Sequence, residues 1–405
     1  MSALKWTEGN AFELLENGEG FFPAVFESIA GATRSVVIET FIIFDDKVGR
    51  ELRQVLLDAA QRGVQVDVTV DGYGTADLPA AYIESLIEAG VRLHVFDPKP
   101  RRLGFRTNLF RRLHRKIVVV DSEIAFIGGI NFGDDHLIDS GPRAKQDYAV
   151  KLRGPLVAEI EADALRLLSA SKHSRPFWRR LRWRGKSVKS HPGGVVAAWV
   201  TRDNDEHTND IEQQYRIGIR AARREITIAN AYFFPGYSLL RDLRNAAKRG
   251  VRVRLILQGE PDMPAARFAA TMLYDYLLSA GVQIYEYCER PFHGKVATVD
   301  GQWATVGSSN LDPLSLALNL EGNVVIRDER FAMCLQERLD YLVDNECRLM
   351  ERGSKPRRKI QRVLVGVFVF HFLRRFPAWA GWFPARKPEL TTLDGPLENI
   401  HEGKS

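Results

Sequence analysis

Polar and apolar residues along this chain follow two alternating patterns. Residues 48–62 and 238–249 are amphipathic, with apolar side chains at the spacing of one helix face. Runs rich in β-branched residues, which favour strands, lie between such segments. Glycines stand where these helices would end and the next strand begin, at Gly63, Gly90, Gly250 and Gly281. This alternation predicts an α/β fold with a largely parallel central sheet.

The pattern occurs twice along the chain. The aligned segments are residues 35–46 with 225–236, 60–70 with 247–257, and 89–96 with 280–287. An internal repeat on this scale indicates that one structural plan is used twice. We therefore expect two repeated α/β domains with mixed central sheets, related by a pseudo-twofold axis and sharing one active site.

The repeat also sets the expected domain boundaries. The first domain is predicted at residues 1–168 and the second at residues 195–350. A basic, aromatic linker at 169–194 joins them, and residues 351–405 form a basic and apolar tail. A chain of 405 residues, 45% of them hydrophobic, is long and apolar enough to build two such cores.

Each half carries one copy of the pattern His-x-Lys-x4-Asp. The copies are His114, Lys116 and Asp121 in the first half and His293, Lys295 and Asp300 in the second. Seven residues after each Asp comes Gly-(Gly/Ser)-x-Asn, which ends at Asn131 and at Asn310. Apolar runs flank the Asp on both sides, which predicts a strand, a tight turn and a second strand. His and Lys then point to one side, because they stand two residues apart, and each Asp holds the turn.

These residue types suit transfer at a phosphodiester. One neutral imidazole can attack phosphorus and form a phospho-histidine, and a second imidazole can give and take the proton. Lys116 and Lys295 supply positive charge for the phosphoryl oxygens, and Asn131, Asn310 and Ser308 supply neutral donors. No metal-ligand spacing is visible, so we expect no metal and no cofactor.

A catalytic imidazole also needs its second ring nitrogen held by an acceptor. Asp147 and Glu321 stand before equivalent strand-like runs, so they are the candidate partners, although strand-edge carboxylates without such a role remain possible. Two further clusters, at residues 134–136 and 205–207, contain Asp or Glu beside His and could ligate a metal on paper. We expect them instead to be exposed loop or helix-start residues.

Taken together, the doubled motif and its trailing Gly-(Gly/Ser)-x-Asn resemble the phospholipase D superfamily over nearly the whole chain. Segments at 39–42, 71–74, 111–119, 144–150, 230–236, 258–264 and 307–316 are similar to bacterial cardiolipin synthases of the B type. The resemblance implies transfer of a phosphatidyl group from one phosphatidylglycerol to another, giving cardiolipin and glycerol. It also implies a phosphatidyl-histidine intermediate formed on His114, with His293 as acid and then base.

Other activities remain open at this point. A phospholipase D-type hydrolase, or a transferase using another alcohol such as glycerol, would share every motif residue. A nuclease of the superfamily is disfavoured by the apolar, Trp-rich tail, and no nucleic acid partner is expected.

The charge balance indicates where the enzyme works. The net charge is +6, and the excess is concentrated in residues 98–112, the linker and the tail. The apolar run at 363–370 is too short to span a bilayer but suits a helix in a membrane interface. Three cysteines without paired spacing and the lack of an apolar leader indicate a reducing compartment. We expect peripheral attachment to an anionic membrane at its cytoplasmic face, with phosphatidylglycerol and other phospholipids as partners.

Overall fold

A computed structural model describes residues 4–98, 101–102, 105–106, 111–169, 194–259, 273–351 and 389–393 of the chain. The linker from 170 to 193 and most of the tail lie outside these residues. In the basic segment at 98–112, the side chains of residues 101–110 also lie outside the described part. The predictions of membrane contact made for the linker and the apolar tail therefore stay predictions.

The first half alternates strands and helices up to the motif and then forms a hairpin. Its elements are β1 (Thr7–Glu16), α1 (Asn17–Ala30), β2 (Ser35–Thr40), α2 (Lys47–Gln61), β3 (Gln65–Asp71), α3 (Ala80–Glu88), β4 (Arg92–Phe96), β5 (Arg101–Arg102), β6 (Phe105–Arg106), β7 (Ile117–Val120), β8 (Ile124–Gly128), β9 (Tyr148–Arg153) and α4 (Leu156–Ser169). Two 3-10 turns, at Asp134–His136 and Ile138–Arg143, connect β8 to β9.

The second half repeats this order. Its elements are β10 (Val195–Arg202), α6 (Asp210–Ala221), β11 (Glu225–Asn230), α7 (Tyr237–Lys248), β12 (Arg252–Gln258), β13 (Gln283–Tyr287), β14 (Lys295–Val299), β15 (Trp303–Gly307), α9 (Pro313–Ala317), β16 (Glu321–Arg327), α10 (Glu329–Asn345) and β17 (Cys347–Leu349). One more strand, β18 (Leu390–Leu393), comes from the tail.

All strands but β5 and β6 join one mixed sheet whose order is symmetric about its centre. The order is β17-β13-β12-β11-β14-β15-β16-β10-β1-β9-β8-β7-β2-β3-β4-β18. Counting outward from the β1–β10 pair, each strand of one half occupies the same position as the equivalent strand of the other half. Strands β2, β3 and β4 are parallel, as are β11, β12 and β13, while the motif hairpins are antiparallel. The predicted fold of two repeated α/β units with mixed sheets is confirmed. The expectation of a largely parallel sheet is wrong, because strands joined by a tight turn, as in the motif hairpins, must run antiparallel, and β1, β10, β17 and β18 also pair antiparallel with their neighbours.

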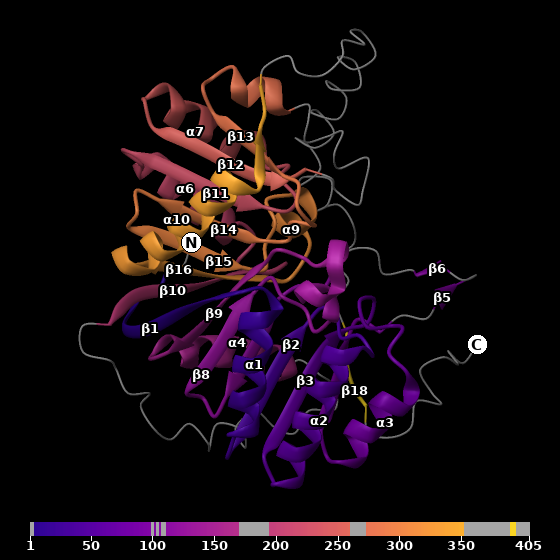
Figure 1. The fold of residues 1–405 in the computed structure, drawn as a ribbon. Coiled ribbons are helices and arrows are strands. Elements are labelled where there is room, and N and C mark those ends of the chain that lie inside the picture. The colour runs from indigo at the N-terminus through magenta and orange to yellow at the C-terminus, as the bar shows by residue number, and fades with distance from the viewer. Residues whose placement is uncertain are drawn as a thin grey trace.

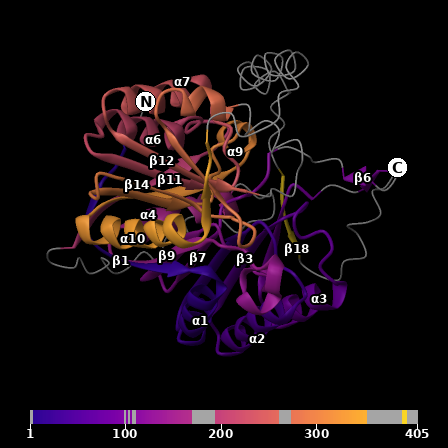
Figure 2. The same cartoon turned by 45° about the horizontal axis from the view of Figure 1, so that its top comes forward.

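Three apolar cores stack the two halves into layers. One core lies between the first-half strands and helices α1, α2 and α3, and another lies between the second-half strands and α6 and α7. The third contains residues from the sheet strands of both halves together with α4 and α10. Figure 2 shows these layers from α6 and α7 at the top to α1–α3 at the bottom, and in Figure 1 the halves lie one above the other. The central core fixes one half against the other.

The hairpin turns are anchored by the motif aspartates. Asp121 accepts hydrogen bonds from the backbone N–H groups of Thr33, Arg34 and Ser35 at 2.7 to 2.9 Å. Asp300 accepts three equivalent bonds from residues 223–225, each at 2.8 Å. Both aspartates have positive φ, 54° and 53°, a conformation that Asp tolerates in turns. Each carboxylate therefore ties the motif hairpin to the start of the neighbouring strand, β2 or β11, which pairs antiparallel with the first strand of the hairpin.

One part of the tail belongs to the globular body, which corrects the expectation that residues 351–405 form only a membrane-interface segment. Strand β18 pairs antiparallel with β4, and Thr392 Oγ1 lies 2.9 Å from His94 Nδ1. It fills the edge position that β17 holds in the other half. The sequence does not show this, because short polar strands such as Leu390–Leu393 carry little signal until an open sheet edge is available. A truncation that removes the whole tail would also remove this strand.

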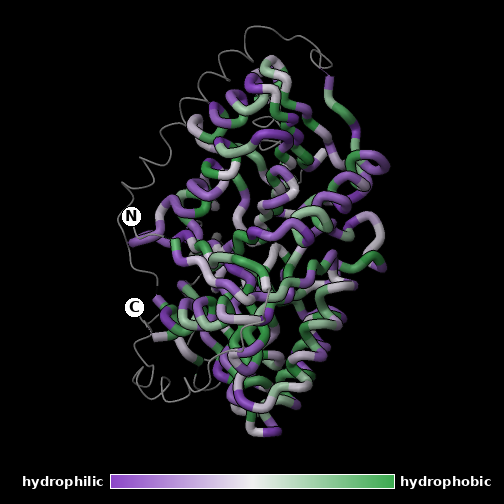
Figure 3. The backbone as a smooth tube through the Cα atoms, turned by 90° about the vertical axis from the view of Figure 1, so that its left-hand side faces the viewer, coloured by the Kyte–Doolittle hydropathy of each residue, from purple (hydrophilic) through white to green (hydrophobic). Residues whose placement is uncertain are grey.

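The described chain contains no long hydrophobic helix. None of its helices combines the length and apolarity needed to cross a bilayer. Figure 3 shows hydrophobic and hydrophilic positions interleaved along both halves. No disulfide bond links the three cysteines.

We expect Asp121→Ala to destabilise the fold without displacing the catalytic side chains. Three backbone N–H groups lose their acceptor, which should cost about 1–3 kcal/mol of unfolding free energy. The measurement is the urea midpoint. Burial would raise the pKa of Asp121, but its backbone hydrogen bonds outweigh it and hold the pKa below the usual value. This contribution should therefore be present above about pH 4 and be lost as the pH falls through the folded-state pKa.

The matched control is Asp139→Ala, whose side chain is 88% exposed. An Asp121 variant as stable as this control would contradict the anchoring role. A variant of full stability without activity would instead indicate direct chemistry by Asp121.

Candidate active site

The two motifs begin just before β7 and β14. Lys116 and Lys295 are buried, and each ammonium group donates back to the carbonyl oxygen of its own motif histidine, at 2.8 Å in the first half. His114 and His293 keep 13% and 17% of their side-chain surface exposed. Each half thus presents an accessible imidazole close in sequence to an enclosed cation.

The backbone on either side of each motif pairs with the opposite half. Leu113 forms a parallel bridge with Leu320, and His114 N–H donates to the carbonyl of Leu320 at 2.9 Å. The equivalent bridge joins Phe292 to Gln146, where His293 N–H donates to the carbonyl of Gln146 at 2.8 Å. The residue that follows each bridge partner is a carboxylate, so these bridges set the site's geometry.

Each histidine is held by a carboxylate from the other half. His114 Nδ1 lies 3.0 Å from Glu321 Oε2, and His293 Nδ1 lies 2.6 Å from Asp147 Oδ2. Order along the chain suggests that each histidine pairs with the carboxylate downstream in its own half, but the structure crosses them. With Nδ1 donating to a carboxylate, Nε2 is the ring nitrogen left for a substrate. The two histidines therefore belong to one site built by both halves.

Burial and mutual repulsion shift the protonation of these groups. Burial lowers the pKa of His114, and burial together with Lys295 lowers the pKa of His293 well below its ordinary value. Burial also lowers the pKa of Lys116 to about 7 and that of Lys295 to about 8. The site therefore favours neutral imidazoles and carries cations that titrate near neutral pH.

The two carboxylates differ from each other. Burial would raise the pKa of Glu321, but His114 and Lys116 outweigh it, so its pKa lies below the usual value. Burial raises the pKa of Asp147 despite the nearby Lys295. Ser308 Oγ donates to Glu321 Oε2 at 2.5 Å, which adds a second hydrogen bond to the Glu321 carboxylate.

The two motif asparagines lie in equivalent buried positions. Asn131 and Asn310 are 4% and 5% exposed, and within the described residues neither side-chain oxygen has a hydrogen-bond partner. Buried polar atoms are normally paired, so these two asparagines are candidates for ligand binding.

Two arginines next to the first motif support its position. Arg115, the middle residue of His-x-Lys, is buried and pairs with Glu39 at 2.8 Å and with Asp163 at 2.5 Å. Arg112 lies 3.5 Å from the Tyr73 ring centroid and 5.7 Å from that of Phe41. The ring of Phe41 in turn lies 5.2 Å from that of His114. The end of the basic segment at 98–112 thus borders the site.

The expectation of an exposed loop at residues 134–136 is wrong for His136. Its side chain is fully buried, and its ring centroid lies 5.7 Å from that of His293. Sequence reasoning missed this residue because the second half has Ser315, not a histidine, at the matching position, and a loop histidine gives no periodic signal. His207, from the other cluster, pairs with Asp210 at 2.7 Å.

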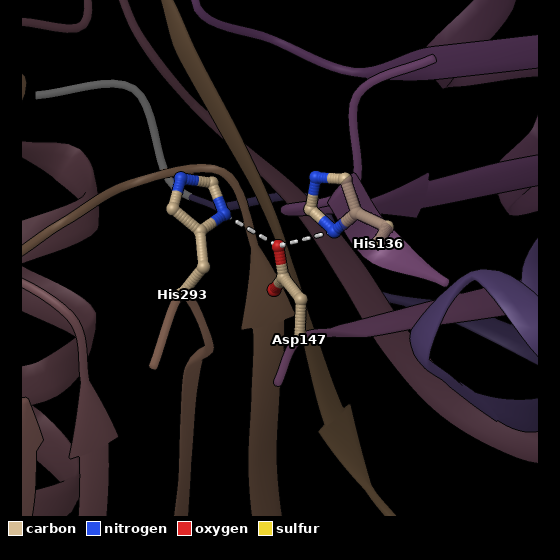
Figure 4. A group of neighbouring side chains, drawn as sticks. All are labelled: His136, Asp147 and His293. Carbon is tan, nitrogen blue, oxygen red and sulfur yellow. Dashed lines mark hydrogen bonds and ion pairs between the residues drawn. The ribbon is translucent and has the colours of Figure 1, made fainter. Parts of the chain in front are cut away.

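His136, Asp147 and His293 are the one group in the described chain whose ligand atoms lie close enough to suggest a metal site, within 4.8 Å of one another. Figure 4 shows both Nδ1 atoms directed at the same carboxylate oxygen of Asp147. Zinc ligands at about 2.0–2.2 Å in a tetrahedron lie roughly 3.3 Å apart. The 2.6 Å separation of His293 Nδ1 and Asp147 Oδ2 is instead that of a short hydrogen bond. The group fits a shared proton better than a metal.

Comparisons with known proteins agree with this geometry. The family model described as "Cardiolipin synthase, PLD-like domain" matches residues 25–166 and 215–343. The chain is 51% identical to cardiolipin synthase B of Salmonella typhi over 393 residues, which cover 97% of this chain and 95% of that protein. It is 50% identical to cardiolipin synthase B of Escherichia coli K12 over 397 residues, covering 98% and 96%.

A solved structure shares the fold. The phosphatidylserine synthase of Haemophilus influenzae aligns with a TM-score of 0.68 over 91% of this chain and 95% of its own. The sequences are only 15% identical, so this likeness concerns the architecture alone.

We expect an alkaline limb in the pH profile of kcat/KM, measured on a soluble short-chain substrate. Lysine is charged below its pKa, so the fraction of enzyme with both cations present falls as the pH rises through about 7 and about 8. Lys295→Arg should move this limb to higher pH, even at a lower maximal rate, because guanidinium stays charged. A profile that stays level up to about pH 9 would show that the lysines need not be charged.

Proposed function

The chain belongs to the cardiolipin synthase family of phospholipase D-like proteins, and on that basis we propose that it transfers a phosphatidyl group from one phosphatidylglycerol to another, giving cardiolipin and glycerol. The observation that carries this proposal is the pair of histidines, each held at Nδ1 by a carboxylate of the opposite half at 3.0 and 2.6 Å. Such a pair supplies one nucleophile and one proton carrier, which a two-step transfer requires.

In the first step, His114 Nε2 attacks phosphorus of the donor lipid. The N–P bond forms as the bond from phosphorus to the glycerol oxygen breaks, and His293 Nε2 gives its proton to that oxygen. Glu321 faces the positive charge that develops on His114, and its low pKa keeps it ionised for this purpose. The substrate's phosphate anion favours the protonated form of His293 against the burial that opposes it.

In the second step, the hydroxyl of a second phosphatidylglycerol attacks the phosphatidyl-histidine. His293 takes the hydroxyl proton, the new O–P bond forms, and the N–P bond to His114 breaks. Cardiolipin leaves, and both histidines return to their starting states. The step is balanced without a metal or a cofactor, so the proposal includes neither.

The remaining motif residues stabilise charge on the substrate phosphate or position the catalytic side chains. Lys116 and Lys295 stabilise the negative charge on the phosphoryl oxygens, and the side-chain NH2 groups of Asn131 and Asn310 donate hydrogen bonds to the same atoms. Ser308 orients Glu321 through its hydrogen bond, while Asp121 and Asp300 hold the hairpins that present the lysines.

We also propose that the enzyme sits peripherally on an anionic membrane, at the cytoplasmic face. Three exposed apolar side chains follow the strands that lead into the site: Phe44 (42% exposed), Ile138 (60%) and Leu314 (43%). Phe44 comes soon after β2, Ile138 after Asn131 and Leu314 after Asn310, so both halves contribute. Apolar side chains at the mouth of a lipid-processing site favour insertion among lipid chains.

The function is tested by incubating the enzyme with labelled phosphatidylglycerol in vesicles and resolving the products. We expect cardiolipin and glycerol in equal amounts. Phosphatidic acid as the main product would show a hydrolase, and a product that appears only with added alcohol would show a different acceptor. His114→Ala and His293→Ala should each abolish turnover, and near-normal activity in either would contradict the two-histidine scheme.

The membrane contact is tested by co-sedimentation with phosphatidylglycerol vesicles. Ile138→Asp with Leu314→Asp should weaken binding and reduce activity on vesicles more than activity on a short-chain, soluble donor. Each exposed apolar side chain can contribute up to about 1.5–3 kcal/mol when buried, so a loss of at least tenfold in binding is expected.

The matched control is Ile217→Asp with Met333→Asp, which are 52% and 48% exposed. Met333 packs beside the turn at Gly301, and Gly218, next to Ile217, faces Val299 and Trp303. Both lie at the far end of the motif hairpin from Lys295. Equal losses in the two double variants would refute a lipid contact at the site.

A further inference from the structure

His136 is a buried histidine for which the proposed mechanism has no use. It is 0% exposed, and the backbone N–H of Asn131 donates to its Nε2 at 3.4 Å. A neutral imidazole that accepts at Nε2 carries its proton on Nδ1. That Nδ1 has no hydrogen-bond partner among the described residues and lies 4.0 Å from Asp147 Oδ2 (Figure 4). An unpaired donor in a fully buried position costs free energy, so such a donor is a candidate for a functional role.

The second half shows what such a donor does. There, Glu321 Oε2 faces two groups, the imidazole of His114 at 3.0 Å and the hydroxyl of Ser308 at 2.5 Å. Strand pairing makes Gly129 the counterpart of Ser308 and Asp147 the counterpart of Glu321. A Cβ on Gly129 would lie 2.3 Å from Asp147 Oδ1, so no serine fits there. The first half therefore cannot supply its second donor from the equivalent position.

We propose that His136 is a positioning residue for His293, acting as the second donor to Oδ2 of Asp147 as Ser308 does to Oε2 of Glu321. The other oxygen, Oδ1, already accepts from the Tyr148 backbone N–H at 2.8 Å. The proposal rests on the proposed function, in which His293 carries the proton. At 4.0 Å the contact is electrostatic, and a shift of about 1 Å closes it to a hydrogen bond. Catalytic hydrogen bonds are often long before substrate binds.

The environment of Asp147 explains why a donor from His136 would be useful: it would stabilise the ionised carboxylate. Asp147 is fully buried, and the charged or titratable groups that act on it and its two imidazoles are Lys116, Lys295, Lys145, Asp135 and His114. Burial disfavours the ionised carboxylate, which must stay ionised and fixed in place to hold His293 Nδ1 through each proton transfer. A second N–H on the same oxygen stabilises that state without adding a net charge.

The test compares two soluble short-chain donors that differ in their leaving group. Glycerol, from phosphatidylglycerol, needs a proton to leave, whereas p-nitrophenolate, from phosphatidyl-p-nitrophenol, leaves without one. His136→Leu should lower kcat/KM for the glycerol donor about ten- to a hundredfold, the usual cost of losing a partner behind an active group. Release of p-nitrophenolate should fall only a few-fold. His136→Asn, which can place an N–H near the lost Nδ1, should recover most of the glycerol activity.

Ser308→Ala is the matched control in the other half. Because Ser308 supports Glu321 and the nucleophile His114, its loss should slow both donors alike. The proposal is overturned if His136→Leu slows both donors equally, if it slows neither, or if Ser308→Ala rather than His136→Leu shows the leaving-group contrast. Thermal midpoints of the variants show whether each is folded. The contrast does not depend on the acceptor, so a wild type that makes no cardiolipin would refute the proposed function but not this role of His136.

Discussion

The crossed hydrogen bonds between histidine and carboxylate are the interaction on which the site depends. Glu321 holds His114 and Asp147 holds His293, so neither half contains a complete catalytic pair. The backbone bridges beside them, Leu113 with Leu320 and Gln146 with Phe292, place each carboxylate against the opposite histidine. The central core, with α4, α10 and residues from the sheet strands of both halves, stabilises this docking. The histidine–carboxylate pairs therefore form only when the two halves are associated.

Burial strengthens these charge interactions and also makes any unpaired charge among them costly. Two lysines, two histidines and two carboxylates share a region from which water is largely excluded, and each would be costly there alone. Together they offset one another only in part, and burial still lowers the lysine pKa values to about 7 and about 8. A phosphate anion beside the two ammonium groups would favour their charged form.

The pseudo-twofold symmetry of the fold does not extend to all side chains of the site. One half pairs the longer Glu321 with Ser308, and the other pairs the shorter Asp147 with Gly129, because a side chain at Gly129 would collide with the carboxylate. His136 approaches the Asp147 carboxylate from the connection between β8 and β9, whereas the matching connection between β15 and β16 carries no histidine. Such a difference allows two similar histidines to perform different tasks within one reaction.

Local sequence patterns determined much of this protein. The doubled motif, the alternating helices and strands, and the turn aspartates depend on residues close together in the chain, so their roles in the fold could be predicted. Pairing across the halves could not, because His114 and Glu321 are 207 residues apart and His293 and Asp147 are 146 apart. The buried position of His136 and the docking of β18 on β4 were also decided only by the tertiary structure. These three features depend on surfaces that form only when distant segments pack together, so the spacing of residues along the chain could not predict them.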